Sequence, residues 1–172
     1  MSRLRAARPL NPWTWLVAPA AACVLATLLM AAPLRIFGLG LPEPVFGMVL
    51  AFAWPVIRPS ILAPFALLAL GLFTDLFWGG PSGLWSLALL TAYGAVLAVR
   101  SLVQSQGWLT TWLWFAAITG LAFGAAFFLA VLSSLNIPDL LGVFWQFLAT
   151  AALYPFADRL IARFEDSDVR FR

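Results

Sequence analysis

The sequence predicts an all-α integral membrane protein, a bundle of six transmembrane helices, and three observations carry this prediction. Hydrophobic residues make up 63% of the 172 residues and charged residues 10%, whereas a soluble domain has about 45–50% and about 25%. The mean hydropathy is +0.97, and a water-soluble globule could not bury so much apolar surface. The apolar segments are also long and continuous, without the alternation of transmembrane β-strands.

Six apolar segments follow one another along the chain, and each is taken as one helix. A membrane helix needs about 20 mostly apolar residues, so residues 1–172 leave room for a single transmembrane domain and no sizeable soluble domain. The expected helices cover residues 13–32, 42–57, 60–77, 84–99, 109–132 and 141–161, followed by a charged cytoplasmic tail at 162–172.

Two boundaries between these helices are marked by proline and glycine. The second segment is the weakest, because Pro44 opens it and Pro55 interrupts it. A helix interrupted in this way can tilt, bend or break. A tight turn at 78–83 separates the third helix from the fourth, and Gly79, Gly80, Pro81 and Gly83 suit it because glycine permits positive φ and proline fixes φ.

The arginines predict the orientation of the bundle. With six helices, nine of the ten arginines fall on one side of the membrane: Arg3, Arg5, Arg8, Arg58, Arg100, Arg159, Arg163, Arg170 and Arg172. Only Arg35 falls on the other side. Since basic residues are enriched in cytoplasmic segments, both termini are expected in the cytoplasm. An interfacial aromatic belt is expected from the tryptophans near predicted helix ends, namely Trp13, Trp15, Trp54, Trp78, Trp85, Trp108 and Trp145.

The missing residue types exclude most site chemistry. The chain has no histidine, no lysine and one cysteine, Cys23, so the usual zinc, copper, haem and iron–sulfur ligand sets cannot be assembled. An intramembrane hydrolase fails for lack of a histidine or a paired acid. The net charge is only +3, which does not indicate a nucleic-acid partner. The sequence therefore predicts no cofactor, no metal, no nucleic-acid binding and no enzymatic activity.

Asp75 lies within the third predicted helix, two positions before its outer end. A charge there is costly unless it is solvated or partnered, and ionisable residues in membrane helices are functional candidates. The free N–H groups that open the next helix suit an anion, so Asp75 is expected to tie the hairpin together or, alternatively, to contact a partner or ligand. Gly71 lies one turn earlier on the same face, where it lets another helix come close.

Small residues recur at four-residue spacing on two helices. These stripes are Ala18, Ala22 and Ala26 on the first helix, and Gly120 and Gly124 on the fifth. Stripes of this kind let membrane helices approach closely. They either pack the bundle itself or receive the transmembrane helix of a partner.

The pattern Gly71-x-x-x-Asp75, then Gly79-Gly80-Pro81-x-Gly83, then an apolar span ending near Tyr93, resembles the core signature of the bacterial MreD family of rod shape-determining proteins. The C-terminal stretch Val143-Phe144-Trp145, followed by Tyr154-Pro155, Arg159 and Arg163, is similar to it as well. Length, six helices and cytoplasmic termini also match. The resemblance covers most of the chain, and its specific part lies in residues 65–95 and 143–163.

The resemblance implies a non-enzymatic scaffold subunit of the rod complex, or elongasome, in the bacterial inner membrane. Members of the family bind MreC, a single-span protein, and support peptidoglycan elongation and rod cell shape. The larger complex includes MreB, RodA and its penicillin-binding transpeptidase, with membrane lipid around it. The family fold is similar to the S-components of vitamin transporters.

That similarity supplies the alternative function, a vitamin-binding subunit of a transporter. Such a protein needs several polar groups converging on an outward-facing cavity. The outer halves of the predicted helices offer few: Asp75, Ser86, Ser133, Ser134 and Asn136. The sequence therefore favours a scaffold that docks helices over a solute binder.

Overall fold

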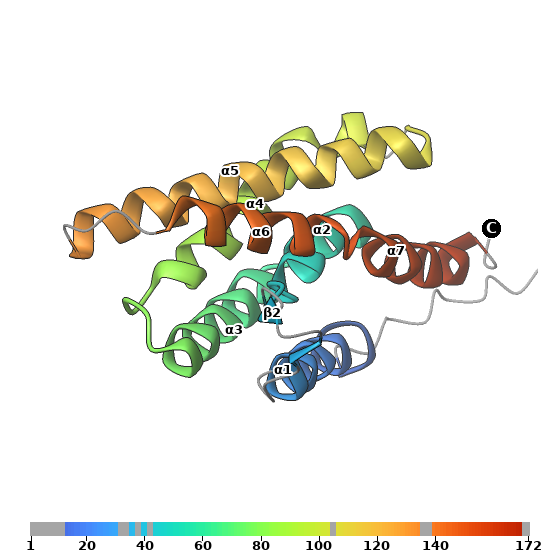
Figure 1. Cartoon of the computed structure of the whole chain (residues 1–172). Coiled ribbons are helices and arrows are strands. Elements are labelled where there is room, and N and C mark those ends of the chain that lie inside the picture. Colours follow the sequence, from blue (N-terminus) through green and yellow to red (C-terminus); the bar gives the residue numbers. More distant parts are fainter. Residues whose placement is uncertain are drawn as a thin grey trace, which may run out of the picture.

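The computed structural model is almost entirely helical, as predicted (Figure 1). It describes residues 13–30, 35–36, 39–40, 43–103, 106–134 and 139–169. The helices are η1 (Trp13–Val17, a π-helix), α1 (Ala18–Met30), α2 (Gly47–Ile57), α3 (Leu62–Trp78), α4 (Leu84–Val103), α5 (Trp108–Ser134), α6 (Leu140–Ala151) and α7 (Tyr154–Val169). One departure from an all-α fold is a two-residue antiparallel ladder between β1 (Arg35–Ile36) and β2 (Leu39–Gly40).

Three segments of the described chain are long and apolar enough to cross a membrane: Leu84–Val103, Trp108–Ser133 and Leu140–Arg163. Their length and composition indicate a membrane protein. Three further apolar helices are shorter: Trp15–Met30, Gly47–Ile57 and Leu62–Trp78. The expected first helix begins as a π-helix at Trp13, and its predicted last residues, 31 and 32, lie outside the described residues.

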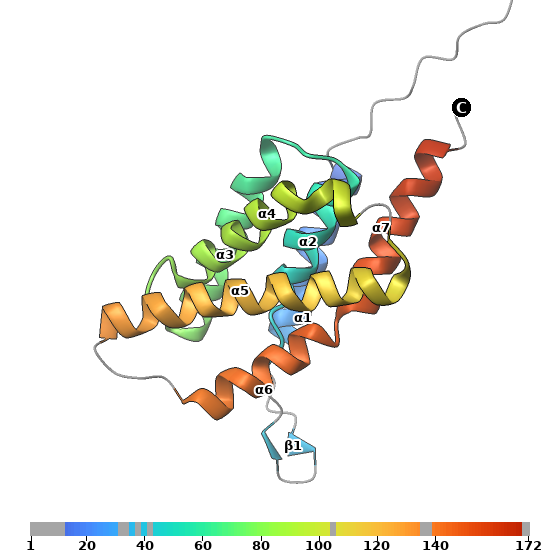
Figure 2. The ribbon, with the colours of Figure 1, turned by 90° about the horizontal axis from the view of Figure 1, so that it is seen from above.

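Successive segments of the fold alternate in direction (Figure 2). The end of α2, the start of α3, the end of α4, the start of α5 and the end of α7 lie toward one side of the molecule. The start of α2, the end of α3, the start of α4, the end of α5 and the start of α6 lie toward the other side, together with β1. The helices also cross steeply, since α1 is seen nearly end-on in Figure 1 while α5 runs lengthwise across the view.

Helix α2 lies at the centre of the fold, although the sequence ranks this segment as the weakest. Ten of its eleven residues are buried, and Trp54 and Ala51 are fully enclosed. The helix continues through Pro55 to Ile57 without breaking. It packs against α4, α7 and α3. Because these helices enclose it, α2 can be shorter than a helix that spans the membrane in contact with lipid.

The sixth predicted segment, 141–161, lies within the membrane-long segment Leu140–Arg163, but it is not one continuous helix. It divides into α6 and α7 at Ala152 and Leu153, one turn before Pro155. Proline has no N–H to donate to the carbonyl four residues earlier, and that carbonyl belongs to Ala151. Part of the charged tail expected at 162–172 is helical, since α7 extends to Val169.

The tryptophans do not all form an interfacial belt. Trp15, Trp54 and Trp85 are buried inside the protein, and the Trp54 indole N–H donates to the Trp15 carbonyl at 3.1 Å. Trp108 is exposed at the start of α5 and fits the expected belt, and Trp145 is exposed in the middle of α6. Hydropathy cannot separate these two groups, since both lie near the ends of apolar segments.

Candidate functional site

The α3–α4 turn is organised by the carboxylate of Asp75, which is 2% exposed. One carboxylate oxygen accepts the backbone N–H of Gly83 and the other accepts the backbone N–H of Trp85, both at 2.8 Å. These donors open α4, where helix N–H groups have no partner within the helix. Asp75 therefore ties the hairpin together, which is the first of the two roles expected for it.

The turn itself uses two of its glycines in the left-handed region. Gly79 has φ 66° and ends α3, and Gly83 has φ 94° just before α4. Both conformations are unfavourable for residues with a Cβ. Gly80, between them, is not among the glycines with positive φ.

Helices α3 and α4 meet closely at Gly71. A Cβ placed on Gly71 would lie 2.5 Å from the backbone nitrogen of Ser86. Ser86 is buried, and its hydroxyl donates to the Leu68 carbonyl at 3.3 Å. The predicted close approach of another helix at Gly71 is present, and the other helix is α4.

A second polar link, which the sequence did not predict, joins the segment before α2 to α3 and α6. The Glu43 carboxylate accepts the Trp78 indole N–H, and the Glu43 carbonyl accepts the Gln146 amide at 3.1 Å. The Val45 N–H donates to the Thr150 hydroxyl at 3.1 Å. The partners are more than 100 residues apart along the chain in two of these bonds, so no local pattern could have indicated them.

The described residues bury no unpaired polar side chain. Among the described residues, every buried side-chain nitrogen or oxygen has a hydrogen-bond partner. The same residues include no group of three histidine, cysteine, aspartate or glutamate side chains able to hold a metal ion. Of the polar residues expected in the outer halves, Asn136 lies outside the described residues and the Ser134 side chain is not described.

An open apolar pocket of about 520 Å³ lies between α1, α2 and α7. Its lining comes from α1 (Ala18, Pro19, Ala22, Cys23 and Ala26), from the start of α2 (Phe46, Val49 and Leu50), and from the end of the chain (Leu153, Phe156, Leu160 and Arg163). The Ala18–Ala22–Ala26 stripe thus lines a recess instead of packing against another helix. Arg163 is the single charged residue in the lining.

The two glycines of the α5 stripe have different surroundings. A Cβ on Gly120 would lie 3.7 Å from the ring of Phe147 in α6, so Gly120 takes part in bundle packing. A Cβ on Gly124 would have no atom within 4 Å, and Gly124 is exposed. It lies between Leu121 and Phe128, which are 56% and 66% exposed on the same outward side of α5.

Four of the five described arginines lie on, or directly after, helices whose ends point toward the same side of Figure 2. Arg58 lies at the end of α2, Arg100 near the end of α4, and Arg159 and Arg163 on α7, all toward one side in Figure 2. Arg35 begins β1, toward the other side. Arg3, Arg5, Arg8, Arg170 and Arg172 lie outside the described residues.

The described site residues thus fall into three separate groups: the Asp75 turn, the pocket beside α1, and the outward face of α5. The first is closed by its own hydrogen bonds, whereas the other two present apolar surface for another molecule. Comparison of this chain with protein-family models, with curated proteins and with solved structures finds no match.

Proposed function

We propose that this protein is a six-span, non-enzymatic scaffold of the MreD type in the bacterial inner membrane. In this role it binds MreC within the rod complex and supports peptidoglycan elongation. The Gly71–Gly83 signature and the 143–163 stretch support the assignment by resemblance. The alternating helix directions and the one-sided arginines support six spans with cytoplasmic termini.

The observation that favours a scaffold is the internal use of its polar groups. Asp75 is occupied by two backbone N–H groups, and Glu43 by the Trp78 indole. The pocket beside α1 is apolar except for Arg163. A vitamin would leave most of its hydrogen-bonding groups unpaired in such a pocket, at about 1–3 kcal/mol each. This cost disfavours the alternative of an S-component-like vitamin binder.

The outward face of α5 is the surface assigned to the MreC helix. Helix α5 has 27 residues, which is about 40 Å at about 1.5 Å per residue, so it covers the full hydrocarbon thickness of about 30 Å. Gly124 leaves a gap between the Leu121 and Phe128 side chains, and a gap of this kind admits a side chain of a partner helix. Close helix packing over small residues is the usual basis of association in membranes.

Co-purification of MreC with the tagged protein from native membranes tests this function. Gly124→Leu fills the gap on α5 and is expected to lower the recovered MreC severalfold. Gly94→Leu on α4 is the matched control, because Gly94 is also an exposed helical glycine with no atom within 4 Å of an added Cβ. This control should retain MreC.

The outcomes of that experiment separate the alternatives. If the unmodified chain recovers no MreC, the rod-complex role is wrong. If MreC is recovered equally with Gly124→Leu and Gly94→Leu, the α5 face is not the docking surface. A water-soluble vitamin bound at one per chain would establish the S-component alternative instead.

A further inference from the structure

The pocket beside α1 has the depth of one membrane leaflet. Ala18 and Ala26 are eight residues apart on α1, about 12 Å at about 1.5 Å per residue. Leu153 and Arg163 are ten residues apart on the opposite wall, about 15 Å by the same helical rise. Half of a hydrocarbon core of about 30 Å is about 15 Å. A transmembrane partner helix would extend through both leaflets, whereas a lipid chain occupies one.

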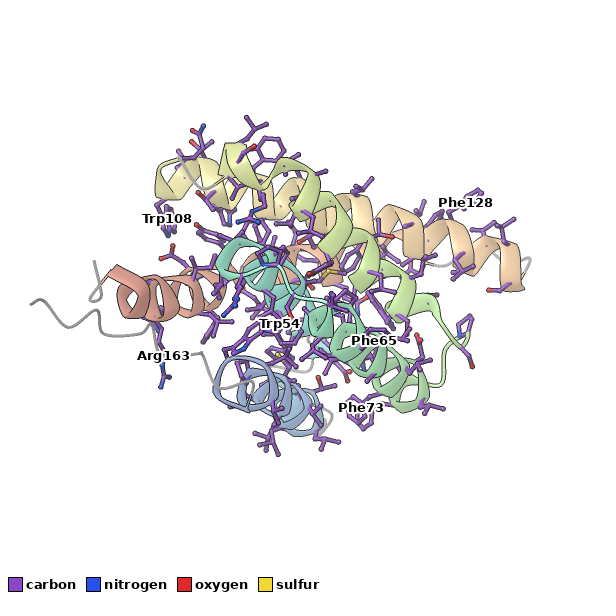
Figure 3. The ribbon with its side chains drawn as sticks, turned by 180° about the vertical axis from the view of Figure 1, so that it is seen from behind. Trp54, Phe65, Phe73, Trp108, Phe128 and Arg163 are labelled. Carbon is purple, nitrogen blue, oxygen red and sulfur yellow. The ribbon has the colours of Figure 1, made fainter. Side chains whose placement is uncertain are left out.

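The charged end of the pocket lies at the predicted cytoplasmic surface. Helices α1 and α7 run in opposite directions (Figure 2), so Ala18 and Arg163 share one end and Ala26 and Leu153 the other. Figure 3 shows the Arg163 side chain leaving α7 toward the side of the molecule on which α1 lies. The pocket therefore places a cation at the interface and apolar side chains below it.

The Arg163 guanidinium has no hydrogen-bond or ion-pair partner among the described side chains. Asp158, the described acid on α7, accepts the Tyr154 hydroxyl at 3.5 Å, and Arg163 forms no ion pair with a described side chain. A guanidinium binds phosphate oxygens through two parallel hydrogen bonds. A partner helix would bring its own basic cytoplasmic flank to this end, which Arg163 would repel.

We propose that this pocket binds one anionic phospholipid of the cytoplasmic leaflet. An acyl chain lies along Ala18, Ala22 and Ala26, above Val49 and Leu50 of α2, and the phosphate binds the Arg163 guanidinium. The lipid fills the recess between α1 and α7 over the start of α2, where Phe46 is partly exposed. The site is independent of the rod-complex role, since no MreC surface contributes to it.

Native mass spectrometry of the full chain in mild detergent, with phosphatidylglycerol as the probe, tests the site. The unmodified protein should retain one phosphatidylglycerol per chain. Arg163→Gln should lower retention about tenfold, which corresponds to about 1.4 kcal/mol, because glutamine cannot supply the charge-assisted hydrogen bonds that a guanidinium makes to phosphate oxygens. Ala22→Leu, which places a larger side chain in the pocket, should lower it at least as much.

Matched controls lie next to each variant. Arg159 is exposed on the same helix and Ala21 is exposed on α1, and neither lines the pocket. Arg159→Gln and Ala21→Leu should therefore retain lipid like the unmodified protein. Positions 21, 22, 159 and 163 are all exposed, so none of these substitutions disturbs the core. The melting temperature of each variant, measured without added lipid, checks that it folds.

Two partial ligands separate chain binding from phosphate binding. Glycerol 3-phosphate lacks the acyl chains and diacylglycerol lacks the phosphate, so each should raise the melting temperature less than phosphatidylglycerol does. Equal loss of lipid in Arg159→Gln and Arg163→Gln would overturn the site, because it would show unspecific attraction to basic residues. Cross-linking of a partner's helix to a cysteine at position 22 would also overturn it, by placing a protein in the pocket.

Discussion

Asp75 and Asp139 perform the same task in different surroundings. Each carboxylate accepts two backbone N–H groups at the start of a helix, Asp75 at 2.8 Å and Asp139 at 3.2 Å from Leu141 and Gly142. Asp75 is buried and Asp139 is exposed. Water can replace an exposed cap, whereas the bond from the Trp85 N–H to Asp75 is buried, so the two residues should differ in their contribution to stability.

Asp75→Ala should lower the free energy of unfolding in detergent by about 1–3 kcal/mol, the cost of leaving buried donors unpaired. Asp75→Asn should keep part of the stability, because the amide oxygen still accepts one of the two bonds. Asp139→Ala, the exposed control, should cost about 0.5–2 kcal/mol, as for an ordinary helix cap. Denaturant unfolding followed by circular dichroism measures all three. An unchanged Asp75→Ala protein would show that the tie contributes nothing to stability.

At the scale of elements, the division between α6 and α7 has a specific compensation. Pro155 cannot donate to the Ala151 carbonyl, and the Trp112 indole N–H from α5 donates to that carbonyl at 3.3 Å. Unpaired backbone groups cost several kcal/mol in a membrane, so a side chain from a neighbouring helix stabilises the bend. Proline is tolerated in membrane helices where such partners exist.

A double-mutant cycle tests this compensation. Trp112→Phe alone should destabilise the protein by about 1–3 kcal/mol, because it leaves the Ala151 carbonyl without its donor. In a Pro155→Ala background the new N–H can reach that carbonyl, so Trp112→Phe should cost clearly less. Trp114→Phe on the same helix controls for lost ring packing, and it should lower the free energy of unfolding equally in both backgrounds. Equal costs of Trp112→Phe in both backgrounds would contradict the compensation.

At the scale of the whole molecule, the connections and the arginines define two sides. The α3–α4 turn lies on the side of β1, and the connection between α4 and α5 lies on the side of the α7 terminus (Figure 2). Ser82 in the turn and Gln106 in the connection are both exposed. A cysteine at either position can therefore be labelled from its own side of the protein without disturbing a packed surface.

The topology prediction uses single cysteines at these two positions, in a Cys23→Ala background. With cytoplasmic termini, an impermeant thiol reagent should label Ser82→Cys in intact spheroplasts and label Gln106→Cys only after lysis. Labelling in the reverse order would invert the orientation. Labelling of both before lysis would exclude the alternation of six spans.

The sequence by itself determined the class of the protein and its local hairpin. Apolar composition indicates a membrane protein without any knowledge of contacts. The Asp75 tie and the Gly71 approach join residues eight to fifteen positions apart, within one helix–turn–helix unit. Such short separations restrict where the side chains can go, so residue type and spacing indicated the Asp75 tie as one of two roles and a close helix approach at Gly71, without identifying α4 as that helix.

Only the tertiary structure decided which apolar segments form the core. It encloses α2, links Glu43 to Gln146 across 103 residues, and leaves the Ala18–Ala22–Ala26 stripe beside a pocket. In a membrane, lipid-facing and protein-facing side chains are equally apolar, since lipid tails are as apolar as leucine. Hydropathy therefore cannot separate lipid-facing from protein-facing side chains. Packing between distant segments determines which of them form the core.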